Sequence, residues 1–386
     1  MTTLLSLYEK WAKAATRGQL SGVVLVDLSE EFDLVSSDLL LQKLQIYGLD
    51  RQFLSWIQSY LSNRLQSVWI DHTYSSFRAN PIGVPQGSNL GPLFFLIFFN
   101  DLPSSLDHDV DCYADDSTLG ATGHAVKEIG VNLTNDCEVL SNWMAANKFK
   151  LNAQKTHIML MGTQQKLRNL EEDLVVEMDG IKLQQSKNKC EVLLGVCIQP
   201  NLKWAEQIQA LVKKIQMRLS GIAILRHSMD ISKKKMIIEG LINSVICYCL
   251  PLYGGCTQDE INLLQSQQNK AAQLALNCPP RTHRDWMFDQ LKWMSVTQLI
   301  AYHTLIAVYR IRQDKRPEFL ATKLLQENRN GNILLPRTFL ELYRKSFVYR
   351  GALLWNRLPS KLRKAKKIQS FKIEIRRWVI ENIDRF

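Results

Sequence analysis

Tyr113-Ala114-Asp115-Asp116 is the stretch that decides the fold of this chain of 386 residues. Two adjacent carboxylates stand on a tight turn between short apolar segments, and a third, Asp27, ends the strand-like run Val23-Val24-Leu25-Val26. Carboxylates delivered from separate strands can hold two divalent cations at one point, as phosphoryl transfer requires. Asp-Asp pairs also occur in solvated turns, and Asp115 follows Asp27 by 88 residues, so their convergence is an expectation.

A glycine-rich segment lies between these two carboxylate sites: Gly83-Val84-Pro85-Gln86-Gly87-Ser88-Asn89-Leu90-Gly91-Pro92. Gly87 lacks a side chain and lets the backbone approach a bound nucleotide or template base. Gln86 offers both a hydrogen-bond donor and an acceptor. Pro92 suits the first turn of the apolar helix expected over Leu93 to Phe99.

In order, spacing and content, these segments resemble the reverse transcriptase palm of non-LTR (LINE-like) retrotransposons. Asp27 to Phe32 resemble motif A, Gly83 to Pro92 motif B, and Tyr113 to Asp116 the YADD box. Two further matches lie downstream. Trp143, Asn147 and Leu151-Asn152-Ala153-Gln154-Lys155-Thr156 resemble motif D, and Leu194-Gly195-Val196 resembles the primer-grip region.

The resemblance implies an RNA-directed DNA polymerase that extends a DNA 3′-hydroxyl on an RNA template by two-metal nucleotidyl transfer. Asp27 and Asp115 are then expected to bridge two Mg²⁺ ions, for which Mn²⁺ can substitute. Asp116 lies alongside, and the carbonyl of Leu28 contributes a further ligand. Lys155 is expected near the pyrophosphate leaving group, where a cation or proton donor helps.

The same resemblance places three residues at the incoming nucleotide. Phe32 is expected beneath the sugar, where its ring collides with a 2′-hydroxyl and favours deoxynucleotides, while Gln86 and Gly87 border the base pair. Each assignment has a plainer alternative: Phe32 packs in the core, Lys155 is a surface lysine, and Asp27 caps a following helix.

The hydrophobic pattern predicts an α+β fold in which helices cover the antiparallel sheet of a palm. A helical thumb and a mainly helical C-terminal region follow. The expected domains are a palm over residues 1–165 with its fingers largely missing, primer-grip strands and a thumb helix over 166–230, and a basic region over 231–386. Predicted strands cover 22–28, 157–161 and 190–198, predicted hairpins 66–78 and 110–122, and predicted helices 37–47, 50–61, 93–99, 126–147, 208–222 and 371–380.

The net charge of +11 is unevenly distributed. Residues 281–386 hold 23 Lys and Arg against 9 Asp and Glu, a balance of +14, which leaves −3 for residues 1–280. This polarity is typical of a region that holds a polyanion, although a solvated basic helical surface gives the same pattern. Residues expected to contact nucleic acid are Gly195, Lys213, Lys214, Arg218, Lys364, Lys366 and Lys367.

Eight cysteines stand at 112, 137, 190, 197, 247, 249, 256 and 278, without a CxxC pair or an ordered histidine spacing. This spacing indicates neither a zinc ribbon nor a disulfide framework, and reduced, mostly buried thiols are expected. Reduced thiols and the lack of a signal peptide favour a protein of the nucleus or cytoplasm that is not secreted. The apolar runs are also too short to predict a membrane span.

Three functional alternatives remain open from the sequence. Besides the polymerase, the chain could be a catalytically inactive remnant that binds nucleic acid, or a di-metal phosphodiesterase, which has no need of Gln86 and Phe32. Only 26 residues precede Asp27, so the chain is expected to be part of a longer polyprotein or to have an artificial start. Arg350, Trp355, Asn356 and Pro359 resemble a segment that recurs in these elements, and no chemistry is assigned to it.

Overall fold

The fold divides into two compact units, and the chain passes between them several times. A computed structural model describes residues 1–26, 31–114, 116–149, 152, 155–224, 228–329 and 331–383. The sheet unit consists of Gln19–Met161 and Arg168–Lys187. The helical unit consists of Met1–Gly18, Gly162–Leu167 and Asn188–Phe386. Both helices and antiparallel strands are present, and the predicted α+β class is confirmed.

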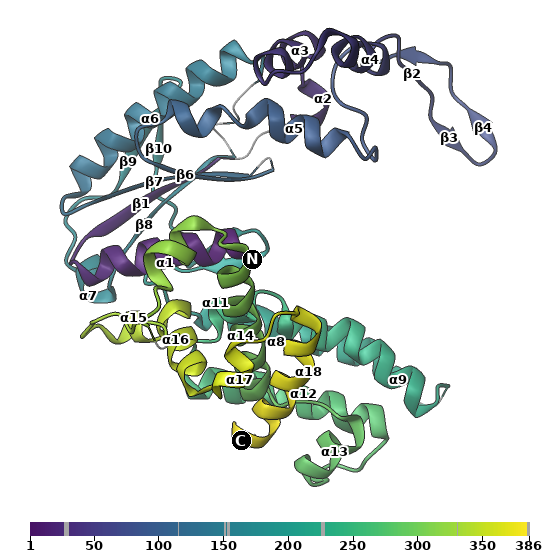
Figure 1. The fold of residues 1–386 in the computed structure, drawn as a ribbon, viewed down its shortest axis with the longest axis vertical. Coiled ribbons are helices and arrows are strands. Elements are labelled where there is room, and N and C mark those ends of the chain that lie inside the picture. Colours follow the sequence, from purple (N-terminus) through teal and green to yellow (C-terminus); the bar gives the residue numbers. More distant parts are fainter. Residues whose placement is uncertain are drawn as a thin grey trace. The chain divides into compact units, whose positions relative to one another are not determined.

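A four-stranded antiparallel sheet forms the centre of the sheet unit, with strand order β6-β7-β1-β8. Helix α6 (Val126–Ala146) lies along the sheet (Figure 1). It packs closely because Gly22 of β1 has no side chain, and a Cβ there would overlap Ile129 of α6. The strands are β6 (Asp109–Tyr113), β7 (Asp116–Gly123), β1 (Leu20–Val26) and β8 (His157–Met161).

The segment between β1 and β6 contains short helices and a long hairpin, largely as predicted. Asp50 caps its helix as expected, since the backbone N–H of Phe53 donates to its carboxylate at 2.8 Å. Figure 1 shows the hairpin extending away from α3, α4 and α5. The elements are α2 (Glu31–Leu34), α3 (Ser37–Ile46), α4 (Arg51–Leu61), β2 (Leu65–Gln66), β3 (Trp69–Ile70), β4 (Thr73–Tyr74), β5 (Arg78–Ala79), α5 (Gly91–Phe99) and η1 (Leu102–Ser105). A second hairpin, β9 (Val175–Met178) and β10 (Ile181–Gln184), lies beside α6.

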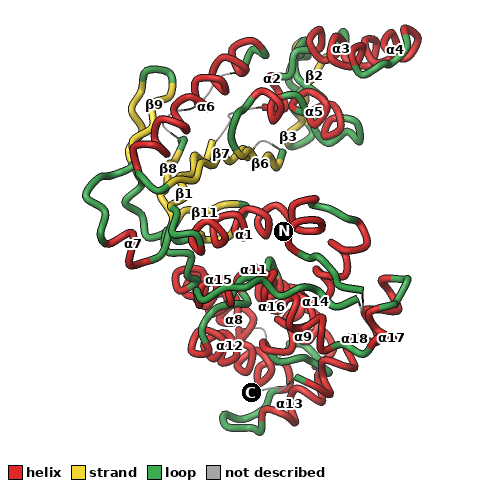
Figure 2. The backbone as a smooth tube through the Cα atoms, turned by 60° about the vertical axis from the view of Figure 1, so that its left-hand side comes forward, coloured by secondary structure: helices red, strands yellow, loops and turns green. Residues whose placement is uncertain are grey.

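The helical unit combines the N-terminal helix with the second half of the chain. Figure 2 shows the part after Trp204 as helices joined by loops. The predicted apolar stripe of α8 (Ala205–Ile224) is buried at Ile208, Leu211, Ile215, Leu219 and Ile222. The other elements are α1 (Thr2–Thr16), α7 (Gln164–Arg168, whose last residue belongs to the sheet unit), β11 (Glu191–Leu193), β12 (Val196–Ile198), α9 (Ile231–Ile238), η2 (Glu239–Asn243), α10 (Ser244–Cys247), α11 (Leu250–Tyr253), α12 (Gln258–Leu276), α13 (Arg284–Leu291), α14 (Val296–Asp314), η3 (Phe319–Leu324), α15 (Glu341–Arg344), α16 (Phe347–Arg357), α17 (Ser360–Arg363) and α18 (Ile368–Asn382).

Two expectations for residues 190–198 are wrong. The single predicted strand is a hairpin, because Leu194 and Gly195 both adopt positive φ and reverse the chain between β11 and β12. Cys190 and Cys197 are joined by a disulfide rather than reduced. The turn brings their Cα atoms to 5.7 Å, within the range that a disulfide needs. The sequence separation of seven residues does not by itself predict this disulfide. Among the described residues no helix is long and apolar enough to span a membrane.

The recurring C-terminal residues have structural contacts in the helical unit. Trp355 is completely buried, and the guanidinium of Arg312 lies 4.3 Å from its ring centroid. Asn356 holds a loop by accepting from the backbone N–H of Ile333 at 2.8 Å and donating to the carbonyl of the same residue at 2.9 Å. Arg350 donates to the carbonyl of Pro251 at 2.6 Å. These contacts give Arg350, Trp355 and Asn356 structural roles.

A buried polar junction ties α1 to this segment. Glu9 is fully buried in α1, and its carboxylate accepts a hydrogen bond from the backbone N–H of Val348 at 2.8 Å. Burial raises the pKa of Glu9 to about 7 and lowers the pKa of the nearby Arg350 to about 10. We refer to Glu9 and Arg350, with the neighbouring Tyr8, as the buried junction.

Candidate functional site

Three of the motif segments meet at one end of the central sheet, where its strands begin or end. Strand β1 runs toward Asp27 and ends at Val26, whose register partner on β7 is Ser117. Asp116 directly precedes Ser117 and begins β7. On the other side of β1, Leu25 pairs with His157, the first residue of β8, which Lys155 precedes by two positions. The antiparallel pairing therefore gathers the segments of motifs A and D and the YADD box at one end of the sheet.

The YADD box lies at the turn of a hairpin, as predicted. Tyr113 of β6 and Asp116 of β7 are register partners, so the chain reverses between them. Ala114 adopts a positive φ of 54°, the conformation that a tight hairpin turn demands. The predicted ligands Asp27, Leu28 and Asp115 lie outside the described residues, within which no group of three or more metal-binding side chains occurs.

Motif A and motif B are joined by backbone hydrogen bonds. The N–H of Val84 donates to the carbonyl of Phe32 at 2.8 Å, and the N–H of Gly83 donates to that of Val35 at 2.9 Å. Gly83 has a φ of +82°, and a Cβ there would lie 2.7 Å from the Cα of Asp33. Only glycine combines this conformation with so close an approach.

A cleft of about 710 Å³ opens beside this connection. The side-chain amide of Gln86 donates to the carboxylate of Asp33 at 3.0 Å, so the two motifs also meet through side chains. Arg64 supports the motif B loop by donating to the carbonyls of Ile82 at 2.7 Å and Gly83 at 2.6 Å. The residues lining the cleft are Asp33, Arg64, Leu65, Gln66, Asn80, Val84, Pro85 and Gln86.

Phe32 and Gly87, the other residues predicted at the nucleotide, are not among the residues that line this cleft. The ring of Phe32 is half-buried and stacks on Phe95 of α5, with centroids 4.5 Å apart. This contact fixes the ring and gives it a packing role, while the expected selectivity role stays a prediction. Gly87 has a φ of +78°, and among the described residues none has an atom within 4 Å of where its Cβ would stand.

The residues predicted to contact nucleic acid are mostly exposed on the helical unit. Lys213 and Lys214 are exposed on α8, whereas Arg218 donates to the carbonyl of Leu241 at 2.6 Å and so links α8 to η2. Gly195 lies at the β11–β12 turn, where the hydroxyl of Tyr248 donates to the carbonyl of Leu194 at 2.7 Å. Lys364, Lys366 and Lys367 are exposed in the loop before α18.

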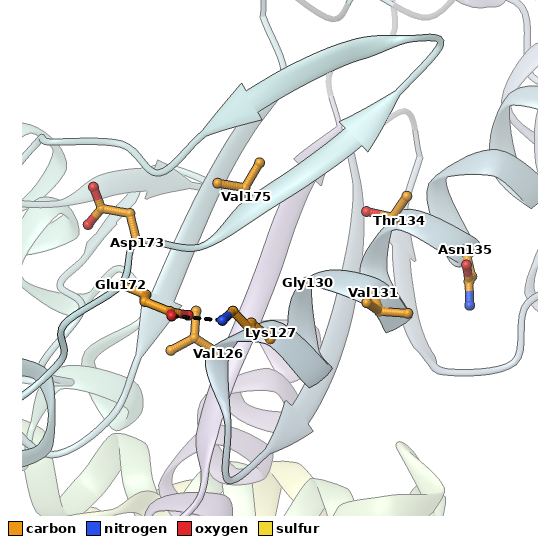
Figure 3. Close-up of a pocket in the computed structure, with 9 residues that line it drawn as sticks. All are labelled: Val126, Lys127, Gly130, Val131, Thr134, Asn135, Glu172, Asp173 and Val175. Atoms are coloured by element: carbon orange, nitrogen blue, oxygen red, sulfur yellow. Dashed lines mark ion pairs between the residues drawn. The ribbon is translucent and has the colours of Figure 1, made fainter.

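A separate groove of about 560 Å³ lies between α6 and β9 (Figure 3). Its lining contains none of the predicted site residues, and Lys127 points toward Glu172, with which it forms an ion pair of 2.9 Å. Gly130 allows the helix to approach the strand, since a Cβ there would lie 2.8 Å from the carbonyl of Val175. The groove therefore lies beside a close contact between the helix and the strand.

Sequence reasoning missed several residues of the cleft. Arg64 and Asn80 stand outside every motif, and their pairing across the base of a hairpin is visible only in three dimensions. Asp33 directly follows the motif A phenylalanine, and no role was predicted for it. This position beside motif A is the signal in the sequence that could have pointed to Asp33.

Sequence comparison tests the family resemblance of the motifs directly. Residues 3–211, more than half of the chain, match the family described as reverse transcriptase (RNA-dependent DNA polymerase). The chain is 26% identical over 319 residues to the "Probable RNA-directed DNA polymerase from transposon BS" of Drosophila melanogaster, covering 78% of this chain and 34% of that protein. It is 24% identical over 325 residues to the RNA-directed DNA polymerase from mobile element jockey of Drosophila funebris, covering 81% of this chain and 34% of that protein.

The chain thus spans about a third of the length of these relatives. A solved structure of telomerase from Candida albicans with a TWJ fragment of telomeric RNA aligns with 99% of this chain and 54% of its own. The sequence identity is 12% and the TM-score is 0.43, which is too low to establish a shared fold. The family match and the mobile-element relatives confirm the resemblance that the motifs carry. The chain belongs to the reverse transcriptase (RNA-dependent DNA polymerase) family.

Proposed function

We propose that this chain carries the polymerase centre of a non-LTR retrotransposon and extends a DNA 3′-hydroxyl on an RNA template. One observation carries the proposal. The strands β1, β7 and β8 bring the segments of motifs A and D and the YADD box together at one end of the central sheet. The cleft between motifs A and B lies in the same unit and offers space for a nucleotide.

The oxygen-bearing residues expected at this end of the sheet are suitable ligands for magnesium. Asp27, Asp115 and Asp116 supply hard carboxylate oxygens, the ligands that Mg²⁺ prefers, and the Leu28 carbonyl is a further candidate. The pairing of Val26 with Ser117 supports their convergence, because Asp27 and Asp116 are the sequence neighbours of these two partners. When bound, two Mg²⁺ ions supply activation of a 3′-oxygen and stabilisation of the charge that develops on pyrophosphate.

Other residues bind and orient the substrates. The stacked ring of Phe32 limits the space at the sugar and so favours deoxynucleotides, while Gln86, held by Asp33, presents its amide at the base pair. Gly87 leaves room for close approach. Lys155, two positions before β8, supplies a cation or a proton to the leaving group.

The nucleic acid is held by contacts to its phosphates. Lys213 and Lys214 on α8 and the turn at Gly195 contact the DNA primer and its RNA template, with Arg218 supporting the helix. Lys364, Lys366 and Lys367 add positive charge that attracts the duplex. Because such contacts release counterions, binding is expected to weaken steeply as salt rises.

Primer extension by the full chain tests the proposal. The substrate is oligo(dT) annealed to poly(rA), with thymidine triphosphate and Mg²⁺. Asp115→Asn and Asp116→Asn are each expected to reduce incorporation by about 1000-fold, since each removes a negatively charged oxygen from the metal site. The isosteric change Asp107→Asn, in the exposed loop before β6, is the matched control and should leave incorporation unchanged.

The inactive remnant is the reading that survives if catalysis fails. Wild type and Asp115→Asn would then incorporate nucleotide equally poorly while both bind duplex. Cleavage of the template–primer by the wild type, with no extension, would instead favour the di-metal phosphodiesterase.

A further inference from the structure

The hairpin between α4 and motif B forms an arm with its own regular hydrogen bonding. Trp69 pairs with Tyr74, and the hairpin is closed at its base by the N–H of Asn80 donating to the carbonyl of Arg64 at 2.8 Å. Asp71 and His72 form the turn, with φ angles of 46° and 68°. We call residues 65–79 the aromatic arm.

The aromatic arm exposes large apolar side chains. Trp69 is 58% exposed, Tyr74 69% and Phe77 69%, and three aliphatic side chains of the arm are similarly exposed. Large apolar side chains gathered on one short hairpin indicate a site of interaction, because their hydration is unfavourable. The exposed aliphatic residues are Leu65, Val68 and Ile70.

The rings of the arm suit the faces of nucleic-acid bases. Trp69 and Tyr74 lie across the hairpin with centroids 6.3 Å apart and planes inclined by 32°. His72 adds a third ring, 5.9 Å from Trp69. Aromatic side chains bind single strands by stacking, whatever the base sequence. The arm carries one base, Arg78, and one acid, Asp71, so it opposes a phosphate backbone with no net negative charge.

Residues at the base of the arm line the cleft of the candidate site. Leu65, Gln66 and Asn80 line the same 710 Å³ cleft as Asp33 and Gln86. A strand that enters this cleft from the side of the arm therefore passes the exposed rings before it reaches motif B. This continuity favours a nucleic-acid strand over a separate protein as the occupant.

We propose that the aromatic arm stacks the bases of the single-stranded RNA template ahead of the cleft, through Trp69 and Tyr74. The proposal rests on the proposed function, which supplies the template. The arm unstacks the approaching strand and delivers it, base by base, to the loop that contains Gln86.

Binding of the full chain to two RNA–DNA duplexes tests the proposal. One duplex is blunt, and the other carries a 5′ RNA overhang of about eight nucleotides, within the usual span of a stacking platform. Affinity is measured by fluorescence anisotropy without metal or nucleotide. Wild type should bind the overhang duplex more tightly, and the double variant Trp69→Ala/Tyr74→Ala should lose about tenfold of that difference while its affinity for the blunt duplex is unchanged.

Two variants control for the loss of rings. Trp69→Phe/Tyr74→Phe keeps the stacking surface and should retain the preference for the overhang. Trp286→Ala removes a tryptophan of similar exposure, 49%, from α13 of the helical unit and should also retain it. In the wild type, 2-aminopurine in the overhang should be quenched on binding, which reports stacking without any substitution.

Three results overturn the proposal: equal affinity of wild type for both duplexes, absence of 2-aminopurine quenching, or equal loss of affinity for both duplexes in the alanine variant. A wild-type dimer that becomes monomeric in the alanine variant, with the overhang preference intact, would assign the arm to self-association instead. Because binding is measured without catalysis, a failure of primer extension refutes the proposed function while the overhang preference still decides the role of the arm.

Discussion

The cleft of the sheet unit and the buried junction of the helical unit use similar polar groups in opposite settings. In the cleft, Asp33 and Gln86 are exposed and border a space of about 710 Å³. In the junction, Glu9 is fully buried, and it and Arg350 are hydrogen-bonded to the protein's own backbone. Both regions contain residues recognised from the same family resemblance. The comparison teaches that resemblance to a family motif does not by itself separate a chemical role from a structural one. Whether the side chain borders an open cleft or is buried among protein atoms does separate them.

The contrast between the two regions depends on the C-terminal segment that contains Arg350 and Trp355 being required for stability. Trp355→Ala is expected to lower the free energy of unfolding by about 3–5 kcal/mol, because it removes a completely buried ring and leaves a cavity. Urea denaturation followed by circular dichroism measures the loss. Trp286→Ala, at an exposed position, should change it by about 0.5 kcal/mol at most.

A glycine substitution tests how much the cleft depends on the connection between motifs A and B. Gly83→Ala is expected to lower the free energy of unfolding by about 3 kcal/mol, since the new Cβ combines a strained φ with overlap against Asp33. Gly180→Ala is the matched control, because Gly180 has a φ of +73° but nothing within 4 Å among the described residues. It should cost about 1 kcal/mol. Equal losses would mean that the close approach is not tight in solution.

The buried junction should make stability depend on pH. The pKa of Glu9 is raised from 4.5 to about 7 in the folded protein, so its carboxyl contributes stability that is fully present below pH 4.5. That contribution is lost as pH rises toward 7 and stays lost above it. Glu9→Gln, which stays neutral, should therefore gain about 2–3 kcal/mol relative to wild type between pH 4.5 and pH 8.

Thermal and urea denaturation across this pH range measure the effect. Arg350, Tyr8 and Tyr343 are the other titratable groups that act on Glu9, or that its charge acts on, so the variant is compared at each pH rather than once. A constant difference between Glu9→Gln and wild type would show that Glu9 is ionised throughout.

The smallest effect is expected from the exposed basic loop. Replacing Lys364, Lys366 and Lys367 together by Gln should reduce duplex affinity a few-fold and flatten the dependence of log K on log salt by about 1 for each lysine that contacts a phosphate. Lys127→Gln is the control: this lysine, with 81% of its side chain exposed, pairs with Glu172 on the sheet unit. An unchanged slope in the triple variant would make this loop a solvated surface.

Much of the fold was predictable because its signals are local. The helix cap at Asp50, the stop at Gly48 with its φ of +89°, and the stripe of α8 each depend on neighbours a few residues away. The hairpin at residues 190–198 was missed because residues 192–198, which include its turn, contain no polar side chain. Its turn is identified by the positive φ of Leu194, which the sequence does not display.

The site was predictable only where a motif marked it. Gln86 lines the cleft, and the pairing of β1 with β7 begins beside Asp116, whereas Arg64 and Asn80 act through contacts across a hairpin that no local pattern specifies. The roles of Phe32 and Gln86 at the nucleotide stay predictions. The expected domain boundaries at residues 165 and 230 stay predictions. The two compact units are defined by contacts between residues, whereas the expected domains are defined by function. The metal ligands also stay predictions, since Asp27 and Asp115 lie outside the described residues.

The passage of the chain between units has a practical consequence. Helix α1 contributes Leu4, Leu5 and Tyr8 to the core of the helical unit, while β1, only a few residues later, is central to the sheet unit. No single cut of the polypeptide frees either unit intact. A protease that clips near Gly18 should therefore leave the N-terminal segment Met1–Gly18 bound to the rest of the helical unit under native conditions. Dissection of this protein into separate pieces calls for circular permutation rather than truncation.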